Sequence, residues 1–162
     1  MLRLLLAALH LVALGLGLGA VWGRARAMSA VARGGAGEAG DTSAVRRAFA
    51  ADAWWGIAAL VWIATGLWRL FGETEKATGY YMRNHVFWAK MGVLVVILLL
   101  EVWPMMTLIR WRIAAGRGEG ARFSGPGAAA ARRIALISYA QAALVVAMVF
   151  AAAAMARGYG AR

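Results

Sequence analysis

Two ionisable residues inside a strongly apolar stretch are the first candidates for chemistry in this sequence. Lys90 and Glu101 lie within residues 84–112, whose centre, 91–100, is apolar apart from one glycine. At about 100° per residue, positions eleven apart return to nearly the same side of a helix, so the two side chains share a face. Because about 16 Å of helix separates them, they cannot pair with each other. Each needs its own partner, and this face must point at other helices rather than at lipid.

Glu101 has candidate hydrogen-bond partners in the last apolar stretch of the chain. Gln141, Ser138 and Tyr139 are the polar residues of that stretch, and Gln141 falls at a depth similar to that of Glu101. The alternative is a carboxyl group that stays protonated because it is removed from water. A structural hydrogen-bonding role is the main hypothesis for Glu101, and a proton relay is the competing one.

Asp52 lies in the first turns of the second apolar stretch, where the helix dipole favours an anion. We expect it to pair with Arg46, Arg47 or Arg112 at the edge of the membrane. Together with Glu101 and its three possible partners, Asp52 completes the predicted structural polar core.

Lys90 has no acidic residue at its own depth in the apolar stretches. One hypothesis is that its long side chain extends outward toward Glu73 or Glu75. The other is that its ammonium group holds an anionic group of a bound molecule.

A haem site is the most specific chemistry that these residues suggest. His10 lies at a depth similar to that of Lys90, and an imidazole can serve as an axial ligand of haem b. His85 or Lys90 would supply the second ligand, and Arg83 would lie near the propionates. The structural alternative is that His10 hydrogen-bonds a neighbouring helix, because two single histidines have no ligand-like spacing.

The composition excludes several kinds of site. The chain has no cysteine, which excludes disulfides, thiolate metal sites and cysteine catalysis. No nucleophile elbow, P-loop, dinucleotide fingerprint or HExxH motif is present, so no catalytic residues are predicted. The net charge of +11 does not indicate nucleic acid, because the basic residues gather in two connecting segments and no basic helix carries interleaved aromatics.

Four apolar stretches must position the residues above. Of the 162 residues, 63% are hydrophobic, against about 45–50% in soluble domains. A membrane-spanning helix needs about 20 apolar residues. We therefore predict one all-α transmembrane domain, residues 1–162, built as an antiparallel up-down four-helix bundle. Its predicted spans are 2–23, 49–71, 85–110 and 132–156. A retained first span is favoured over a signal peptide, because its apolar region is long and basic residues follow it.

The third span is expected to be the hub of the bundle. Pro104 inside it removes one main-chain hydrogen bond, which predicts a kink near residues 100–103. Residues 23–48 are expected to form a linker, and the short polar turn 72–83 should make the second and third spans neighbours. The tryptophans at both ends of the second span are expected at the membrane interfaces.

Three glycines on the first span form a possible packing face. Gly15, Gly19 and Gly23 recur at every fourth position, and such spacing lets a neighbouring helix approach closely. The alternative is the ordinary enrichment of glycine in membrane helices.

The distribution of Lys and Arg predicts the orientation of the chain. Most of these residues fall in the loops 24–47 and 112–133, which should therefore be cytoplasmic. Both termini and the middle turn should then lie on the outer, periplasmic side of a bacterial inner membrane.

Four segments of the sequence carry a resemblance to a known family. They are FAADAWWGIAALVWIATGLWRLF, EKATGYYMRNHVFWAKMG, LEVWPMMTLIRWR and ARRIALISYAQAALVVAMVFAAAAMARG. Over nearly its whole length the chain resembles a bacterial family of small predicted membrane proteins, catalogued as a domain of unknown function, type 2214. The resemblance implies an inner-membrane helix bundle and brings no established activity. The outline of His10 in the first span and Lys90 at the start of the third also resembles membrane haem proteins of the HemJ and copper-resistance-D type, which puts those two residues forward as candidates.

The leading functional hypothesis from the sequence is a non-catalytic accessory subunit. Its Gly-rich first span and Ala-rich last span offer two surfaces for close packing in a larger membrane complex. The alternatives are a haem b redox or haem-handling protein and, third, a small transporter or proton-relay component. The expected partners are the lipid bilayer and other membrane subunits.

Overall fold

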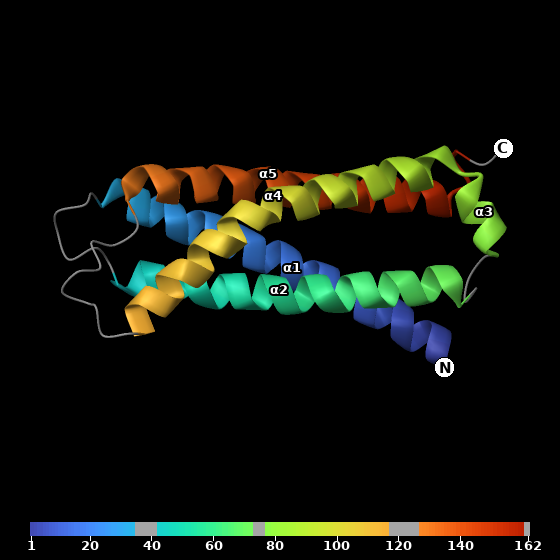
Figure 1. Ribbon diagram of the computed structural model, residues 1–162. Helices are drawn as coiled ribbons and strands as arrows, with labels where there is room; N and C mark the ends of the chain where they lie inside the picture. Colours follow the sequence, from blue (N-terminus) through green and yellow to red (C-terminus); the bar gives the residue numbers. More distant parts are fainter. Residues whose placement is uncertain (35–41, 73–76, 117–126, 161–162) are drawn as a thin grey trace.

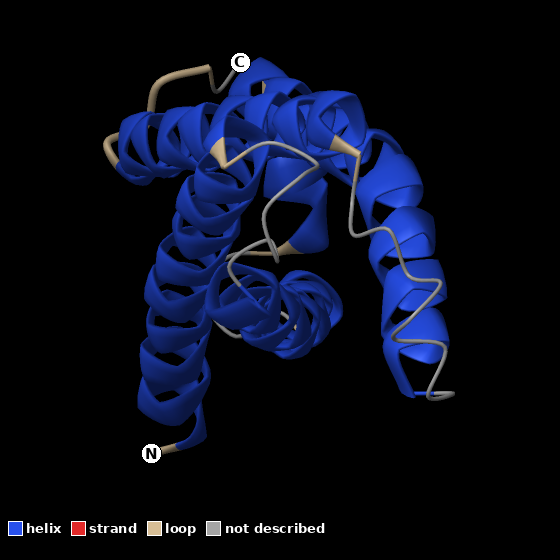
Figure 2. Cartoon of the chain, turned by 90° about the vertical axis from the view of Figure 1, so that its left-hand side faces the viewer, coloured by secondary structure: helices blue, strands red, loops and turns tan. Residues whose placement is uncertain are grey.

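The computed structural model describes residues 1–34, 42–72, 77–116 and 127–160. In these ranges the chain forms helices and no strand (Figure 2). The helices are α1 (Leu2–Arg33), α2 (Thr42–Phe71), α3 (Thr78–Met82), α4 (His85–Gly116) and α5 (Ala128–Ala156). All but the short α3 are long and apolar enough to cross a membrane.

The first helix is longer than hydropathy alone predicts. The expected linker at residues 23–48 is wrong in its first and last parts, because α1 continues through Arg24 to Arg33 and α2 already begins at Thr42. Gly23 does not stop it, and the first pair of adjacent glycines after Trp22 is Gly34 and Gly35. The physical reason is that a charged side chain can continue a membrane helix when other helices cover it.

The central helix of the bundle is α1, and not α4 as expected. α1 packs along both α2 and α5, whereas α4 packs mainly on α5 and approaches α2 only briefly. Both termini and α3 lie at one end of the elongated molecule (Figure 1). α4 runs along α5 near this end and diverges from it toward the other end (Figure 1), and Pro104 lies within this helix.

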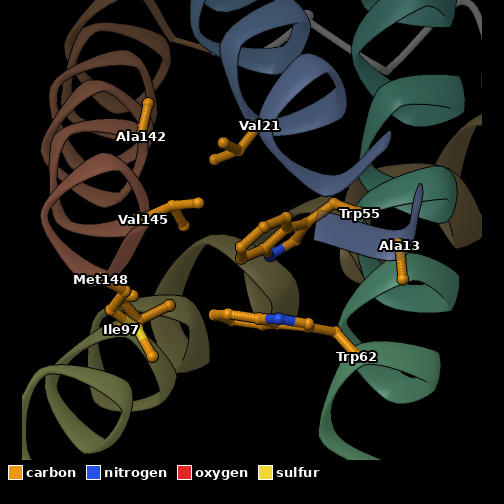
Figure 3. Close-up of a cluster of buried hydrophobic side chains, with 8 residues drawn as sticks. All are labelled: Ala13, Val21, Trp55, Trp62, Ile97, Ala142, Val145 and Met148. Carbon is orange, nitrogen blue, oxygen red and sulfur yellow. The ribbon is translucent and has the colours of Figure 1, made fainter. Parts of the chain in front are cut away.

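Apolar side chains from all four long helices fill the middle of the molecule. One cluster combines Trp55 and Trp62 of α2 with residues of α1, α4 and α5 (Figure 3). Both tryptophan rings point inward in that view, toward Val145 and Met148. Trp55 and Trp62 are thus core residues, whereas Trp54 and Trp68, nearer the two ends of the predicted second span, are exposed on the outside.

The outer surface of the long helices is apolar as well. Exposed leucine, valine, isoleucine and methionine side chains cover it, such as Leu60, Leu99 and Leu136. A soluble domain rarely exposes so continuous an apolar surface, whereas lipid-facing helices require one. The bundle therefore has the surface of a membrane protein.

Candidate functional site

A buried arginine joins all four long helices about two thirds of the way along α1. Arg24 has no exposed surface. Its Nη1 and Nη2 atoms donate to the two carboxylate oxygens of Glu101 on α4, at 2.6 and 2.7 Å. The same guanidinium donates to Asp52 on α2 at 2.8 Å, and to Ser138 and Gln141 on α5 at 3.0 and 2.9 Å. We call these five residues the Arg24 cluster.

Two further contacts extend the Arg24 cluster. Gln141 Nε2 donates to Glu101 Oε2 at 2.8 Å and to the main-chain oxygen of Ile97 at 3.1 Å. Arg112 lies 3.7 Å from the second oxygen of Asp52 and donates to the main-chain oxygen of Phe49. Two guanidinium groups thus face two carboxylates, so the charges in and beside the cluster balance.

The structure places the predicted polar residues as follows. Gln141 does bond Glu101, and Arg112 lies beside Asp52, as the sequence suggested. Ser138 bonds Arg24 rather than Glu101, and Tyr139 packs its ring edge-on against Trp22. The central residue, Arg24, was missed because its position was assigned to a linker. The signal that could have found it is the absence of a strong helix stop before Gly34.

At the opposite end of the bundle, next to α3, a pocket of about 360 Å³ opens among all five helices. This volume lies in the usual range for small-molecule sites, about 300–1,000 Å³. Its walls are mostly leucine, methionine and alanine side chains, and its polar lining residues are His10, Arg69, Tyr80, Tyr81 and Lys90. We call it the outer pocket.

The hydrogen bonds around His10 assign the proton on its ring. His10 Nδ1 lies 2.9 Å from Thr65 Oγ1. The threonine hydroxyl donates its one hydrogen to the main-chain oxygens of Val61 and Trp62, at 2.7 and 3.1 Å. Thr65 must therefore accept a hydrogen bond from His10, so Nδ1 carries the proton. In the neutral ring the lone pair is then on Nε2, which is the arrangement that metal-binding histidines adopt.

The four residues of the predicted haem site do not all meet. His10 and Lys90, from α1 and α4, line the same pocket. His85 and Arg83 are exposed near the start of α4 and are not among the lining residues. Arg69, which the sequence analysis did not select, lines the pocket at the end of α2.

Lys90 has no hydrogen bond or ion pair with any part of the chain that the structure describes. The expected partners Glu73 and Glu75 lie outside the described residues. Over the described ranges, no group of three His, Asp or Glu side chains is placed to hold a metal ion.

An apolar layer separates the outer pocket from the Arg24 cluster. Along α4, the pocket residue Lys90 is followed by the core residue Ile97 and then by Glu101 of the cluster. Along α5 the same order runs from Met148 through Val145 to Gln141. The two polar regions are therefore distinct sites.

A family model described as a predicted membrane protein, DUF2214, matches residues 2–160. The chain belongs to the DUF2214 family. The matched range includes both the outer pocket and the Arg24 cluster, so both are built from residues of the DUF2214 domain itself. No curated protein and no solved structure matches the chain.

Proposed function

We propose that this DUF2214 protein binds an amphipathic ligand in the outer pocket, and that haem b is the first candidate. The observation that carries the proposal is that His10 and Lys90, far apart in the sequence, line one mostly apolar pocket. Haem in a membrane protein needs an axial ligand, an apolar cavity for the ring and cations for the propionates.

The residues of the pocket fit such a group. The imidazole of His10 would be the axial ligand of the iron, and Thr65 fixes the orientation of its ring. Trp62 lies against the histidine, with ring centroids 5.8 Å apart. Arg69 supplies a positive charge at the end of α2. When bound, the haem would supply redox or haem-transfer chemistry, and the chain would hold and orient it.

The visible absorption spectrum of the purified protein tests this proposal. We expect a Soret band that His10→Ala removes. His85→Ala is the matched control, since His85 is exposed outside the pocket, and this variant should keep the band. Protein reconstituted with haemin that shows no His10-dependent Soret band would refute the haem assignment.

The accessory-subunit function is the second candidate, and the surface of α1 supports it. A Cβ atom at Gly15 or Gly19 would meet nothing within 4 Å, whereas one at Gly23 would just touch Ala51. Gly15 and Gly19 thus leave part of the small face uncovered for another helix. Exchanging both for leucine should abolish co-purification of a partner subunit from the native membrane and leave the bundle itself folded. Unchanged co-purification would contradict this function.

The transporter or proton-relay function has less support. Both carboxylate oxygens of Glu101 accept hydrogen bonds from Arg24, which gives Glu101 a structural role in the bundle. The outer pocket is not lined by Glu101.

The proposed location is a bacterial inner membrane, with the chain crossing as an antiparallel up-down bundle. The excess of basic residues in the segments 24–47 and 112–133, which join α1 to α2 and α4 to α5 and include the ends of these helices, supports a cytoplasmic position for both connections. Both termini and the outer pocket would then lie toward the periplasm.

A further inference from the structure

The end of the molecule opposite α3, which we call the arginine end, is surrounded by exposed arginines (Figure 1). Each of the four long helices contributes two of them: Arg26, Arg33, Arg46, Arg47, Arg110, Arg112, Arg132 and Arg133. Beyond the Arg24 cluster, the described residues of this end include no aspartate or glutamate. The connections at this end add two arginines and only three acidic residues, Glu38, Asp41 and Glu119. Even if each of these acids pairs with an arginine, most of the arginines have no counter-charge from the chain.

One of these arginines is held by an aromatic ring. Arg133 of α5 lies over the indole of Trp103 on α4, with 4.6 Å between Cζ and the ring centroid. This distance gives a cation–π attraction. The indole supplies no oxygen acceptor for the N–H donors of the guanidinium, and neither does any other residue in the described part of the chain. Arg133 is therefore a positioned cation whose hydrogen-bond donors are available to a ligand.

The guanidinium of Arg133 points toward the middle of the bundle. Gln141 is level with Glu101, because their side chains are hydrogen-bonded. Seven residues nearer the arginine end on each helix, Ile134 and Leu108 belong to one buried cluster. Arg133 therefore starts near the level of Leu108, and Trp103 lies about 7 Å deeper along α4. Arginines near the ends of membrane helices usually extend the other way, toward water.

A second arginine stands on the same side of α4 as this ring. Arg110 follows Trp103 by seven residues, which is nearly two helical turns and about 10 Å toward the arginine end. It is exposed, and no described residue supplies an acceptor for it. Because Arg133 starts between the levels of Trp103 and Arg110, the two guanidinium groups lie on one stretch of the surface where α4 meets α5.

We infer that Arg110, Arg133 and Trp103 form a binding site for the headgroup of an anionic phospholipid. The lipid phosphate accepts hydrogen bonds from the guanidinium of Arg133, and Arg110 adds a second positive charge. The acyl chains follow Val96 and Leu99, which are exposed on the same side of α4 as Trp103. The surplus of arginines at this end favours an anionic lipid over a zwitterionic one. This site is separate from the outer pocket and does not depend on a ligand there.

Native mass spectrometry of the full-length protein in detergent tests the site. The protein is titrated with a mixture of phosphatidylglycerol and phosphatidylcholine that carry the same acyl chains. One arginine near a membrane surface contributes about 5-fold in affinity for an anionic lipid. Two arginines therefore predict that the first phosphatidylglycerol binds about 25-fold tighter than phosphatidylcholine. Equal affinity for the two lipids would overturn the inference.

Three variants locate this preference. Arg110→Gln and Arg133→Gln should each reduce it about 5-fold. Both side chains are exposed, so both variants should fold. Trp103→Leu keeps both charges but removes the ring that positions Arg133, and it should reduce the preference about 2-fold to 5-fold. An unchanged preference in all three variants would also overturn the site.

Arg132→Gln is the matched control, because it removes the exposed arginine next to Arg133. Arg132 precedes Tyr139 by seven residues and shares its side of α5, and the ring of Tyr139 packs against Trp22 of α1. Arg132 therefore faces α1 rather than α4, and its loss should leave the preference unchanged. A loss as large as that of Arg133→Gln would show that the arginines act through their total charge, which would overturn the site.

Inorganic phosphate distinguishes a lipid headgroup from a free anion. Phosphatidylglycerol that stays bound in excess inorganic phosphate, at the same ionic strength as a chloride control, supports a lipid site. Displacement by phosphate but not by chloride would assign the two arginines to a free phosphate and overturn the lipid assignment.

Discussion

Arg24 has as many hydrogen-bond acceptors around it as it has donors. A guanidinium group presents five N–H donors in a fixed fork. Five hydrogen bonds lead from Arg24 to Ser138, Asp52, Glu101 and Gln141, two of them to Glu101. Because a buried charge is costly unless it is paired and fully hydrogen-bonded, this match is what permits a charged residue at this depth.

Removing Arg24 should therefore destabilise the bundle strongly. Arg24→Ala leaves Glu101 and Asp52 without their main counter-charge, and breaking a buried pair in this way costs about 3–5 kcal/mol. Arg24→Lys should be intermediate, since an ammonium group cannot reproduce the fork. The free energy of unfolding in mixed micelles, measured by titration with SDS, gives these values. Arg26→Ala is the control, because Arg26 is exposed on the same helix. Equal stability of Arg24→Ala and Arg26→Ala would contradict the role of Arg24.

The sequence predicted the acceptors of this cluster better than its donor. Glu101 and Gln141 stand out as polar residues inside apolar stretches, so their pairing follows from depth alone. Arg24 borders an apolar stretch and is surrounded by other arginines, so hydropathy places it in a loop. Only the packing of α1 against α2 and α5 shows that it is covered. Likewise, Arg69 gives no signal in the sequence that distinguishes it from Arg83.

Among the helices, α1 and α2 pack closely where a glycine of α1 faces a tryptophan of α2. A Cβ atom at Gly17 would lie 3.4 Å from Trp55 and 3.5 Å from the Cβ of Ala58. The glycine spacing in the sequence had instead selected Gly15 and Gly19, two positions before and after Gly17. The four-residue spacing of the glycines therefore indicated a helix rich in small residues. It did not identify which side of α1 contacts α2, because that depends on how α1 is rotated about its axis.

Substituting leucine for Gly17 or for Gly15 should distinguish the side of α1 that packs on α2 from the side that is uncovered. Gly17→Leu adds a side chain against a buried ring, and such overpacking costs about 1–3 kcal/mol. Gly15→Leu adds the same side chain where nothing lies within 4 Å, so its effect should stay within about 0.5 kcal/mol. Both changes replace glycine by leucine in the same helix, so they gain equally in helix propensity. The difference between their free energies of unfolding in SDS therefore measures the effect of packing alone. If the two variants unfold alike, Gly17 does not define the contact between α1 and α2.

The last residues of the described chain hold the start of α4. Asn84 accepts hydrogen bonds from the main-chain N–H groups of Val86 and Phe87, and its amide donates to the main-chain oxygen of Tyr159. His85 N donates to the main-chain oxygen of Gly160. The link between Asn84 and the C-terminal segment cannot be predicted from the sequence, because it joins residues far apart in the chain.

Gly160→Ala should release the C-terminal segment from α4. Gly160 has a φ of +80°, and a Cβ atom there would lie 2.6 Å from Val86 Cγ2. Gly158 has a φ of +87° but open space around it, so Gly158→Ala carries only the backbone strain. We expect limited proteolysis to remove the C-terminal residues of Gly160→Ala faster than those of Gly158→Ala. Equal rates would show that the contact with α4 does not hold the segment.

The molecule as a whole is apolar on its outside and carries its charge in two internal sites and at its ends. Its polar interior is layered, with the outer pocket next to α3, the apolar cluster of Trp55 and Trp62 in the middle, and the Arg24 cluster beyond it. The four spans and their approximate positions follow from hydropathy, because apolar length is a local property. The layering does not, since it depends on which faces of the helices meet.

The absence of cysteine makes the proposed orientation directly measurable. Single cysteines can be placed at Tyr159, which is exposed near the C-terminus, and at Gly34, which is exposed at the end of α1. If the basic loops are cytoplasmic, a membrane-impermeant maleimide added to intact spheroplasts should label Tyr159→Cys and leave Gly34→Cys unlabelled. Inverted vesicles should give the opposite pattern, and a permeant maleimide should label both variants in either preparation. The reverse pattern would place the outer pocket on the cytoplasmic side, so its ligand would have to arrive from the cytoplasm. The position of the outer pocket relative to the Arg24 cluster would be unchanged, because it is fixed by the packing of the helices and not by their orientation in the membrane.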